Sequence, residues 1–380
     1  MARPPRKRGG DPVAKGVSRL SRLLTRDRDR MSSAYLGDAE LREAYRAYFL
    51  PVNLAKVHLP LFELSLHPGG LLGRDRLRVL DIGAGPGTAM LGALTFLLGR
   101  EPVPTLEFTA VDQIAENLRI AEALFRELRD RSNAKASLRT VASRIEDLHG
   151  RLSGAFDLII VSNVLNELFP DAGDRVRRRR ELLDGMLRLL LADSGSCVII
   201  EPALRETTRD LLGVRDGMLD AGWHVYSPCL LQEHCPALGN PKDWCHEDRS
   251  WDPPEIVREI DARTGLRKDS LKFSYTILRR DRSKLADVHG ADAFRVVSEP
   301  LISKGKTDVY LCGRGGRRLA TRLDKDASAA NAPFTELLRG DIVRCEGLGT
   351  EEKRYRVTKH TTVTNSCRPG MSSGQEAEDR

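Results

Sequence analysis

Long apolar runs are absent from this 380-residue sequence. No stretch approaches the roughly 18 consecutive apolar residues of a membrane helix, and no apolar segment near the start resembles the core of a secretory signal. The 41% of residues that are hydrophobic are nevertheless enough for a sizeable core. We therefore expect a soluble globular protein without a membrane partner. Membrane-spanning, secreted, collagen-like and wholly disordered classes are disfavoured.

Cysteine is also sparse, with seven residues in the whole chain. A small and odd number of cysteines does not make a disulfide scaffold in a chain of this length. Reduced thiols, some of them at a metal site, explain the number better, and they indicate a reducing compartment.

An excess of basic residues exists only at the start of the chain. Residues 1–30 hold ten basic and three acidic residues, which equals the net charge of +7 of the whole chain. Any affinity for nucleic acid must therefore come from this arm or from local patches. Val17 and Leu20 share a helical face, but the arm has too little apolar area to fold alone. Contact with RNA phosphates, a mitochondrial presequence and a solvated tail remain open as its role.

The composition divides the chain into five parts. We predict a basic disordered arm at 1–32, a helical pre-domain at 33–70, a central α/β domain at 71–290 with a cysteine-rich loop at 228–251, a small β subdomain at 291–362 and a disordered polar tail at 363–380. Aromatic side chains of the pre-domain are expected to pack against the central domain. They are Tyr35, Tyr45, Tyr48 and Phe49.

Strands and helices alternate from Leu77 onward. Apolar segments that read as buried strands occur at 77–83, 106–112, 137–143, 156–165 and 197–204, with helical patterns between them. Such regular alternation predicts a parallel sheet with helices on both faces, which is a Rossmann-like α/β fold.

A glycine-rich loop follows the first of these strands. Asp81, Gly83, Gly85 and Gly87 form the pattern Asp-x-Gly-x-Gly-x-Gly, and the missing Cβ atoms let a nucleotide-like ligand approach the backbone at the edge of the sheet. A hydride-transfer dinucleotide fold would need its third glycine at Thr88. The pattern instead resembles the first motif of class I S-adenosylmethionine-dependent methyltransferases.

Acidic residues follow the next two strands. Asp112 ends the second strand, where a carboxylate can accept hydrogen bonds from both ribose hydroxyls of the cofactor. Glu146 follows the third strand, where the methyltransferase pattern places adenine contacts, although it can equally cap a helix. The predicted S-adenosylmethionine site thus consists of Asp81, Gly83, Gly85, Gly87, Asp112 and Glu146.

The end of the fourth strand carries the candidate catalytic residues. Methyltransferases that act on base amino groups resemble one another in an Asn- or Asp-Pro-Pro-aromatic tetrapeptide at this point, which is absent here. Asn163 and Asn166 can still orient an acceptor, because methyl transfer depends mainly on positioning, or they can cap the following helix. We favour an enzyme, and a methyltransferase fold retained for binding alone is the alternative.

Three cysteines lie close together in the loop at 228–251. Cys229, Cys235 and Cys245 are accompanied by His234 and His246, but their spacing is not that of ordinary zinc modules. A metal site of unspecified kind, a zinc site completed by His234 or His246, and a loop with three free thiols are the open alternatives.

Four short motifs together resemble one family. They are Cys235-Pro236, Asp243-Trp244-Cys245-His246, the strand Phe273–Arg280 and Leu311–Gly316 with its Cys312. With the glycine motif, they are similar to the methyltransferase-like assembly factors of the mitochondrial small ribosomal subunit and their bacterial relatives. The resemblance covers about residues 35–345.

This resemblance implies both a cofactor and a partner. It implies a four-iron, four-sulfur cluster on Cys229, Cys235, Cys245 and Cys312, with zinc as the alternative, and binding to small-subunit rRNA and the pre-subunit particle. Cys197, Cys345 and Cys367 have no counterpart. The expected functions are rRNA methylation, non-catalytic ribosome assembly, or methylation of a small molecule beside a zinc loop.

Two further expectations concern the setting of the protein. We expect the free chain to be monomeric, and we favour the bacterial cytoplasm over the mitochondrial matrix because acidic residues in the arm are unusual for a transit peptide. Arginines at 175–180 and at 314–322 are candidates for phosphate contacts or for solvated charged faces.

Overall fold

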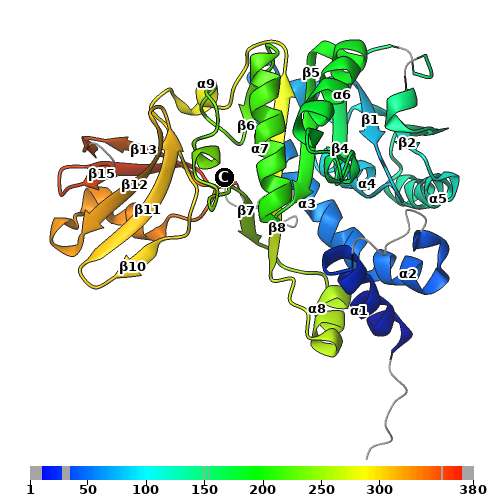
Figure 1. Cartoon of the computed structure of the whole chain (residues 1–380), viewed down its shortest axis with the longest axis horizontal. Helices are drawn as coiled ribbons and strands as arrows, with labels where there is room; N and C mark the ends of the chain where they lie inside the picture. Colours follow the sequence, from blue (N-terminus) through cyan, green and yellow to red (C-terminus); the bar gives the residue numbers. More distant parts are fainter. Residues whose placement is uncertain (1–10, 28–34, 149, 153, 352–353, 370–380) are drawn as a thin grey trace, which may run out of the picture.

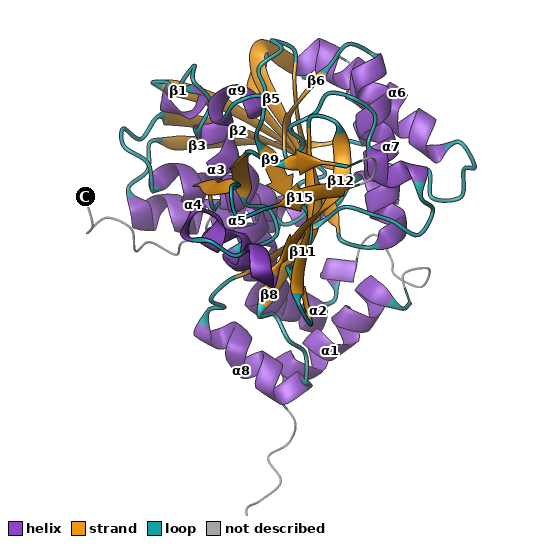
Figure 2. Ribbon diagram, turned by 90° about the vertical axis from the view of Figure 1, so that its left-hand side faces the viewer, coloured by secondary structure: helices purple, strands orange, loops and turns teal. Residues whose placement is uncertain are grey.

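The computed structural model describes residues 11–27, 35–148, 150–152, 154–351 and 354–369. Two β-sheets, here called sheet A and sheet B, lie side by side (Figure 1). Helices cover both faces of sheet A, whereas sheet B projects from one edge of it (Figures 1 and 2). Within the described ranges, no helix is long and apolar enough to cross a membrane.

Sheet A confirms the predicted α/β architecture. Its strand order is β3-β2-β1-β4-β5-β8-β6, with β7 paired to β8 outside this row. The first five strands run parallel, and β8 is antiparallel to β5, β6 and β7. The strands are β1 (Arg76–Ile82), β2 (Thr105–Asp112), β3 (Ala136–Ala142), β4 (Phe156–Ser162), β5 (Leu191–Pro202), β6 (His224–Ser227), β7 (Glu247–Ser250) and β8 (Ser270–Arg279).

Two apolar layers enclose sheet A because its central strands are apolar on both faces. Val79 and Leu158 belong to the cluster on one face, and their neighbours Leu80 and Ile159 belong to the cluster on the other. α3, α4 and α5 cover the first face, and α6 and α7 cover the second. These helices are α3 (Leu50–Ser65), α4 (Thr88–Leu98), α5 (Ala115–Ser132), α6 (Arg175–Leu190) and α7 (Arg205–Asp220).

The predicted disordered arm is wrong for residues 11–27. Pro12–Thr25 form helix α1, which begins where the Asp11 side chain accepts a hydrogen bond from the Val13 N–H (3.0 Å), and Val17 and Leu20 are completely buried. The apolar face that could not fold alone packs against α2 (Ala39–Ala44) and α8 (Glu255–Thr264), and α8 comes from much later in the chain. Residues 1–10 and 28–32 of the predicted arm lie outside the described residues.

The aromatic residues of the pre-domain pack as predicted. Tyr48 is fully buried, and Tyr45 and Phe49 are each 8% exposed in the π-helical turn η3 (Tyr45–Phe49). The Tyr48 hydroxyl donates a hydrogen bond to the Asp261 carboxylate of α8. This hydrogen bond joins the turn η3 to α8. Short 3-10 turns flank the region at η2 (Tyr35–Gly37) and η4 (Leu71–Gly73).

Sheet B contains the strands that follow residue 290. Its order is β14-β15-β12-β11-β9-β13-β16, and β10 pairs with β11. The strands are β9 (Phe294–Val296), β10 (Leu301–Ser303), β11 (Lys306–Gly313), β12 (Gly316–Leu323), β13 (Ile342–Glu346), β14 (Gly349–Thr350), β15 (Arg354–Val357) and β16 (Thr362–Cys367).

The predicted disordered tail begins too early. β16 extends to Cys367 and pairs with β13, and the Arg368 guanidinium binds the buried Asp341 carboxylate (2.9 Å). The polar composition of this segment hid the strand, because β16 is held by its pairing with β13 and by a hydrogen bond from Asn365 to the buried Asp341 carboxylate (2.9 Å). Residues 370–380 lie outside the described part.

A buried ion pair connects the pre-domain to both sheets. Glu63 of α3 is fully buried, and its carboxylate accepts hydrogen bonds from Arg295 Nη1 of β9 (2.7 Å) and from the Tyr275 hydroxyl of β8 (2.5 Å). Arg295 also donates to the carbonyl oxygens of Pro228 (3.0 Å) and Gly340 (2.8 Å). The start of the cysteine-rich loop is thereby fixed to the same point.

Replacement of Leu20 by alanine tests whether α1 belongs to the folded protein. Because Leu20 is completely buried, Leu20→Ala should lower the free energy of unfolding by about 2–5 kcal/mol, as for other large-to-small core changes. Lys15→Ala on the exposed face of α1 should change it by less than about 0.5 kcal/mol. Equal effects in urea denaturation would show that α1 is not packed.

Candidate functional site

Three glycines follow β1 in a loop that is tightly packed at Gly83 and unobstructed at Gly85. Gly83, Gly85 and Gly87 have φ values of +65°, +53° and +83°, which favour glycine. A Cβ atom at Gly83 would collide with Val164, whereas one at Gly85 would meet no described atom within 4 Å. The backbone at Gly85 is therefore accessible to a ligand. Helix α4 begins directly after this loop, so its N-terminal N–H groups lie at the same edge of the sheet.

Asp112 meets the glycine loop at the end of β2. Its carboxylate accepts hydrogen bonds from the N–H of Gly85 (2.8 Å), the N–H of Ile114 (2.8 Å) and the side-chain amide of Asn117 (3.3 Å). β1 and β2 are parallel neighbours in register, with Ile82 opposite Val111, which brings the two motifs together. A carboxylate has about four acceptor sites, so Asp112 retains capacity for hydroxyl donors.

Asp81 supports the loop from beneath. It is 1% exposed, and its carboxylate accepts a hydrogen bond from the Met90 N–H in the first turn of α4 (2.9 Å). Burial raises the Asp81 pKa to about 7, although the Met90 hydrogen bond opposes this shift, and the charge of Asp112 adds to it. The geometry makes Asp81 a group that fixes the loop to α4.

Glu146 lies on the short turn Ile145–Asp147 after β3. It is partly exposed, and its carboxylate pairs with Arg144 at 3.4 Å. At the ends of their strands, Asp112 of β2 lies opposite Ala142 of β3. Glu146 comes shortly after β3 and therefore lies at the same edge of the sheet as Asp112. Its proposed contact with adenine stays a prediction.

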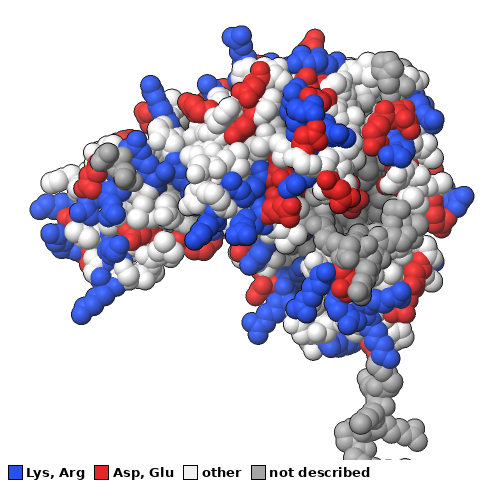
Figure 3. Space-filling view, in the orientation of Figure 1, with Lys and Arg blue, Asp and Glu red and all other residues white. Residues whose placement is uncertain are grey.

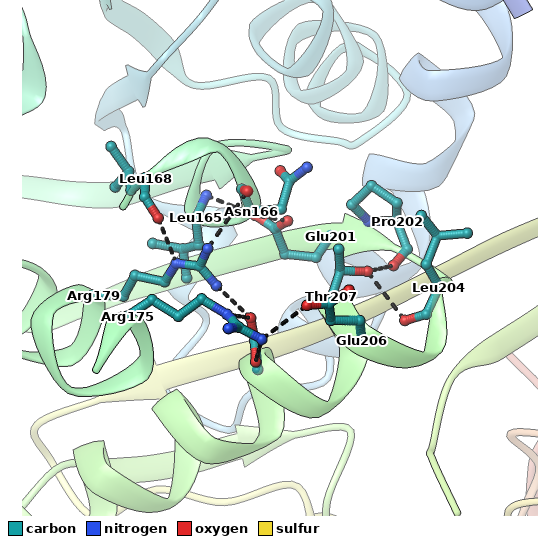
Figure 4. A network of polar contacts seen from close by, with 11 residues as sticks. Leu165, Asn166, Leu168, Arg175, Arg179, Glu201, Pro202, Leu204, Glu206 and Thr207 are labelled. Atoms are coloured by element: carbon teal, nitrogen blue, oxygen red, sulfur yellow. Dashed lines mark hydrogen bonds and ion pairs between the residues drawn. The ribbon is translucent and has the colours of Figure 1, made fainter. Parts of the chain in front are cut away.

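The turn after β4 contains both candidate catalytic residues. Asn163 has φ +57°, and its N–H donates to the Ile200 carbonyl (2.8 Å), while Asn166 lies in the 3-10 turn Leu165–Glu167. The buried carboxylate of Glu201, at the end of β5, accepts hydrogen bonds from the N–H groups of Val164 (3.1 Å), Leu165 (2.9 Å) and Asn166 (3.3 Å), as Figure 4 shows in part. Burial raises the Glu201 pKa to about 8, against the hydrogen bonds that lower it. The turn is therefore held by a residue that the sequence analysis did not select.

One arginine of the cluster at the start of α6 contacts this turn. Arg179 is 3% exposed, donates to the Leu168 carbonyl (2.9 Å) and pairs with Asp210 (2.7 Å). Arg175 shares Asp210 and also pairs with Glu206 (2.9 Å), which places the two guanidinium groups side by side (Figure 4). The other members also have acidic partners. Arg175 and Arg179 thus bind groups within the protein, whereas phosphate contacts of Arg177, Arg178 and Arg180 stay a prediction.

Two tyrosines of the pre-domain reach the same region. The Tyr45 hydroxyl lies 2.8 Å from the Thr88 hydroxyl at the start of α4. Burial raises the Tyr35 pKa, and so do the neighbouring groups Tyr45, Glu167 and Asp112. The helical pre-domain therefore adjoins the predicted cofactor site, which the aromatic pattern alone could not reveal.

Four of the seven cysteines line one cavity between sheets A and B. They are Cys229, Cys235, Cys245 and Cys312. The first three belong to the loop between β6 and β7, and Cys312 is on β11. Cys197 is buried in β5, and Cys345 and Cys367 are on β13 and β16, so none of them lines this cavity. The cavity has a volume of about 50 Å³, several times what one water molecule needs.

The thiols in this cavity are shielded from water. The pKa values of Cys235 and Cys245 are raised to about 12, chiefly by burial and in addition by nearby cysteine sulfurs. Burial also raises the Cys312 pKa, on which all three other cysteines act in the same direction. The four sulfur atoms therefore lie within one another's electrostatic range.

The cavity does not suit a single metal ion. Among the described residues, no group of three or more His, Cys, Asp and Glu side chains is arranged to hold one ion. A single zinc ion requires its sulfur ligands about 2.3 Å from one point, whereas a cluster distributes its thiolate ligands over several iron atoms. His246 stacks on Trp244 with ring centroids 3.9 Å apart, and His234 is exposed and paired with Asp220 at 2.9 Å.

Two arginines of α7 hold the cysteine-rich loop. Arg209 donates to the carbonyl oxygens of Asn240 (2.8 Å) and Asp243 (2.7 Å), and Arg215 donates to those of Leu231 (2.9 Å) and Glu233 (2.5 Å). The sequence analysis did not select either residue. Basic residues on one helix gave no signal that their partners are main-chain groups of a distant loop.

The strand order, the glycine loop after β1 and the acidic end of β2 define the class of the protein. The chain has the class I S-adenosylmethionine-dependent methyltransferase fold, with a helical N-terminal part and a C-terminal β subdomain. The family model described as "Mitochondrial small ribosomal subunit Rsm22" matches residues 43–330. The chain therefore belongs to the Rsm22 family, which confirms the family resemblance of its cysteine motifs.

Solved structures give only distant similarity. The plantazolicin methyltransferase BamL, solved with a desmethylPZN analog and SAH, is 14% identical with a TM-score of 0.38, covering 71% of this chain and 98% of its own. The YcgJ protein from Bacillus subtilis is 16% identical with a TM-score of 0.31, covering 58% and 95%. Such similarity does not define an activity. No curated protein gives a significant sequence match.

The buried Asp81 carboxyl should make stability depend on pH. Its folded-state pKa is about 7 against an ordinary value of 3.8, so the folded chain binds its proton more tightly, and the contribution is lost as pH rises through 7. The free energy of unfolding should thus fall from pH 4 to 7 by up to about 1.4 kcal/mol per pH unit. Asp81→Asn should flatten this slope in urea denaturation at several pH values. An unchanged slope would contradict the assignment.

Asp112 gives a direct test of the cofactor site. Removal of its carboxylate in Asp112→Ala should weaken S-adenosylmethionine binding at least tenfold, which is about 1.4 kcal/mol, because two ribose hydrogen bonds depend on it. Isothermal titration calorimetry measures the change. Glu146→Ala is the parallel variant for the adenine contact. Wild-type affinity in Asp112→Ala would disprove the assignment.

Proposed function

We propose that the protein binds S-adenosylmethionine at the glycine loop and acts on small-subunit rRNA or in assembly of the small ribosomal subunit, in support of translation. Gly83, Gly85 and Gly87 would receive the cofactor, with Asp112 accepting from its ribose hydroxyls and Glu146 at its adenine. Membership of the Rsm22 family supports the ribosomal setting. The convergence of Asp112 on the Gly85 N–H supports the cofactor site.

The observation that carries this proposal is the meeting of four cysteines in one cavity. We infer that Cys229, Cys235, Cys245 and Cys312 hold a four-iron, four-sulfur cluster. The chemistry of the donors fits, since Fe–S clusters are held by four thiolates, and the apolar surroundings exclude water. When bound, such a cluster supplies a rigid cross-link and a one-electron redox centre. The protein itself supplies thiolates from both sheets.

Exposed basic residues of sheet B support an RNA partner. Lys and Arg side chains are prominent over this part of the molecule (Figure 3). Lys304, Arg314 and Arg354 are exposed there and could contact phosphates. Two arginines of the cluster expected at 314–322 bind other residues of the protein. Arg317 pairs with Asp243, and Arg322 donates a hydrogen bond to Asn331.

Methyl transfer to an rRNA base is the activity we favour, with Asn163 and Asn166 orienting the acceptor. The turn that carries both residues is held in place, because the Glu201 carboxylate accepts hydrogen bonds from three N–H groups of this turn. A non-catalytic assembly factor is the second candidate, which the missing Pro-Pro-aromatic tetrapeptide favours. The cavity offers little support for a small-molecule methyltransferase with a zinc loop. We propose the bacterial cytoplasm as the setting, with the mitochondrial matrix as the alternative.

Metal analysis of cysteine variants tests this function. Anaerobically purified wild type should contain about four iron and four sulfide per chain, and Cys235→Ser should lose most of both. The same variant should sediment less with small-subunit particles, because the loop and sheet B would no longer be cross-linked.

Cys345→Ser provides the matched control. Cys345 lies in sheet B outside the cavity, so this variant should keep wild-type iron and wild-type sedimentation. Zinc in place of iron, or no metal in the wild type, would refute the cluster. If Cys235→Ser lacks iron but sediments normally with small-subunit particles, ribosome binding does not require the cluster.

A further inference from the structure

Two arginines of the cavity lining lie beside its cysteines. Arg215 of α7 lies where the sulfurs of Cys229 and Cys235 act on its guanidinium, and Arg317 of β12 lies where those of Cys245 and Cys312 do so. Both arginines line the cavity, Arg215 from helix α7 and Arg317 from strand β12 of sheet B. Arg215 is 1% exposed and the Arg317 side chain 15% exposed.

Each of these arginines keeps one buried donor without a partner. The Nη atoms of Arg215 donate to the loop carbonyls and to Asp216, and Arg317 Nη1 donates to Asp243 while its guanidinium lies 4.8 Å from the centre of the Tyr310 ring. The Nε–H of Arg215 and that of Arg317 have no hydrogen-bond partner within the described residues. An unsatisfied buried donor costs about 1–3 kcal/mol, and more when it is charged.

Arg295 and Arg339 of the cavity lining keep such a donor as well, but the cysteine sulfurs act on Arg215 and Arg317. Donors without partners beside the cysteines indicate an acceptor that completes them. Thiols are weak hydrogen-bond acceptors and do not satisfy charged donors well. Four thiolates around an iron-sulfur core make an anionic group whose sulfur atoms accept hydrogen bonds, and such bonds help to set its reduction potential.

We propose that Arg215 and Arg317 are positioning residues that donate their Nε–H groups to sulfur atoms of the group held by the four cysteines and thereby raise its reduction potential. This inference rests on the proposed cluster. Reduction adds one negative charge to the site. Two cationic donors stabilise the reduced form more than the oxidised form, so their removal should make reduction harder.

A redox titration of Arg317→Gln followed by electron paramagnetic resonance tests this role. Loss of the donor and the charge should disfavour reduction at least tenfold, which lowers the midpoint potential by about 59 mV for a one-electron couple. Arg317→Lys keeps the charge without the Nε–H, so its potential should lie between those of wild type and Arg317→Gln. Arg215→Lys tests the second donor in the same way.

Asp243→Asn separates an electrostatic role from a structural one. Asp243 belongs to the cysteine-rich loop and pairs with Arg317, so both variants break the same ion pair. If Arg317 only fixed the loop, both would change the potential in the same direction. Under our proposal they change it in opposite directions, because Asp243→Asn removes a negative charge beside the site.

Arg318→Gln is the matched control on the same strand. Its guanidinium lies over the Tyr355 ring at 5.4 Å and does not line the cavity, so the wild-type potential is expected. An iron-sulfur cluster with unchanged potential in Arg317→Gln and Arg317→Lys would overturn this inference and leave the proposed cluster intact. A wild type without iron and sulfide would refute both.

Discussion

The buried ion pair between Glu63 and Arg295 is the interaction on which the arrangement of the molecule depends. Glu63 belongs to the helical pre-domain, Arg295 to sheet B, and the Tyr275 hydroxyl that completes the site to sheet A. Because Arg295 also binds the Pro228 carbonyl, the cysteine-rich loop begins from a fixed point. Removal of either charge would leave the other buried without a partner, which is far more costly than loss of a surface pair. This contact therefore holds in place the elements that line the cavity between the sheets.

The two candidate sites use the same sheet in different ways. The glycine loop and Asp112 lie at the carboxyl ends of parallel strands, where the fold always brings successive loops together. The cysteine cavity lies away from these loops, where the antiparallel strand β8 of sheet A adjoins sheet B. α7 connects the two regions, because Asp210 holds the arginines beside the β4 turn while Arg209 and Arg215 hold the cysteine loop.

The sequence predicted sheet A well because the apolar runs and the glycine motif are local signals. Three of the four cysteines were recognisable from their clustering in one loop, whereas Cys312 was added by the family resemblance. It could not predict α1 as a packed helix, since the faces that bury Leu20 come from α2 and α8. Nor could it select Glu201, Arg209 or Arg215, whose partners are main-chain groups far away in the chain. Residues that bind backbone atoms leave no pattern in the sequence.

The division of the cysteines between two sheets has a consequence for biosynthesis. Three of them lie on one loop, whereas Cys312 arrives on β11, after sheet A has received its last strand. A chain that emerges from its N-terminus can thus complete the methyltransferase-like part while the cavity still lacks one wall. The cavity closes only when sheet B folds against the loop, so its completion follows that of sheet A.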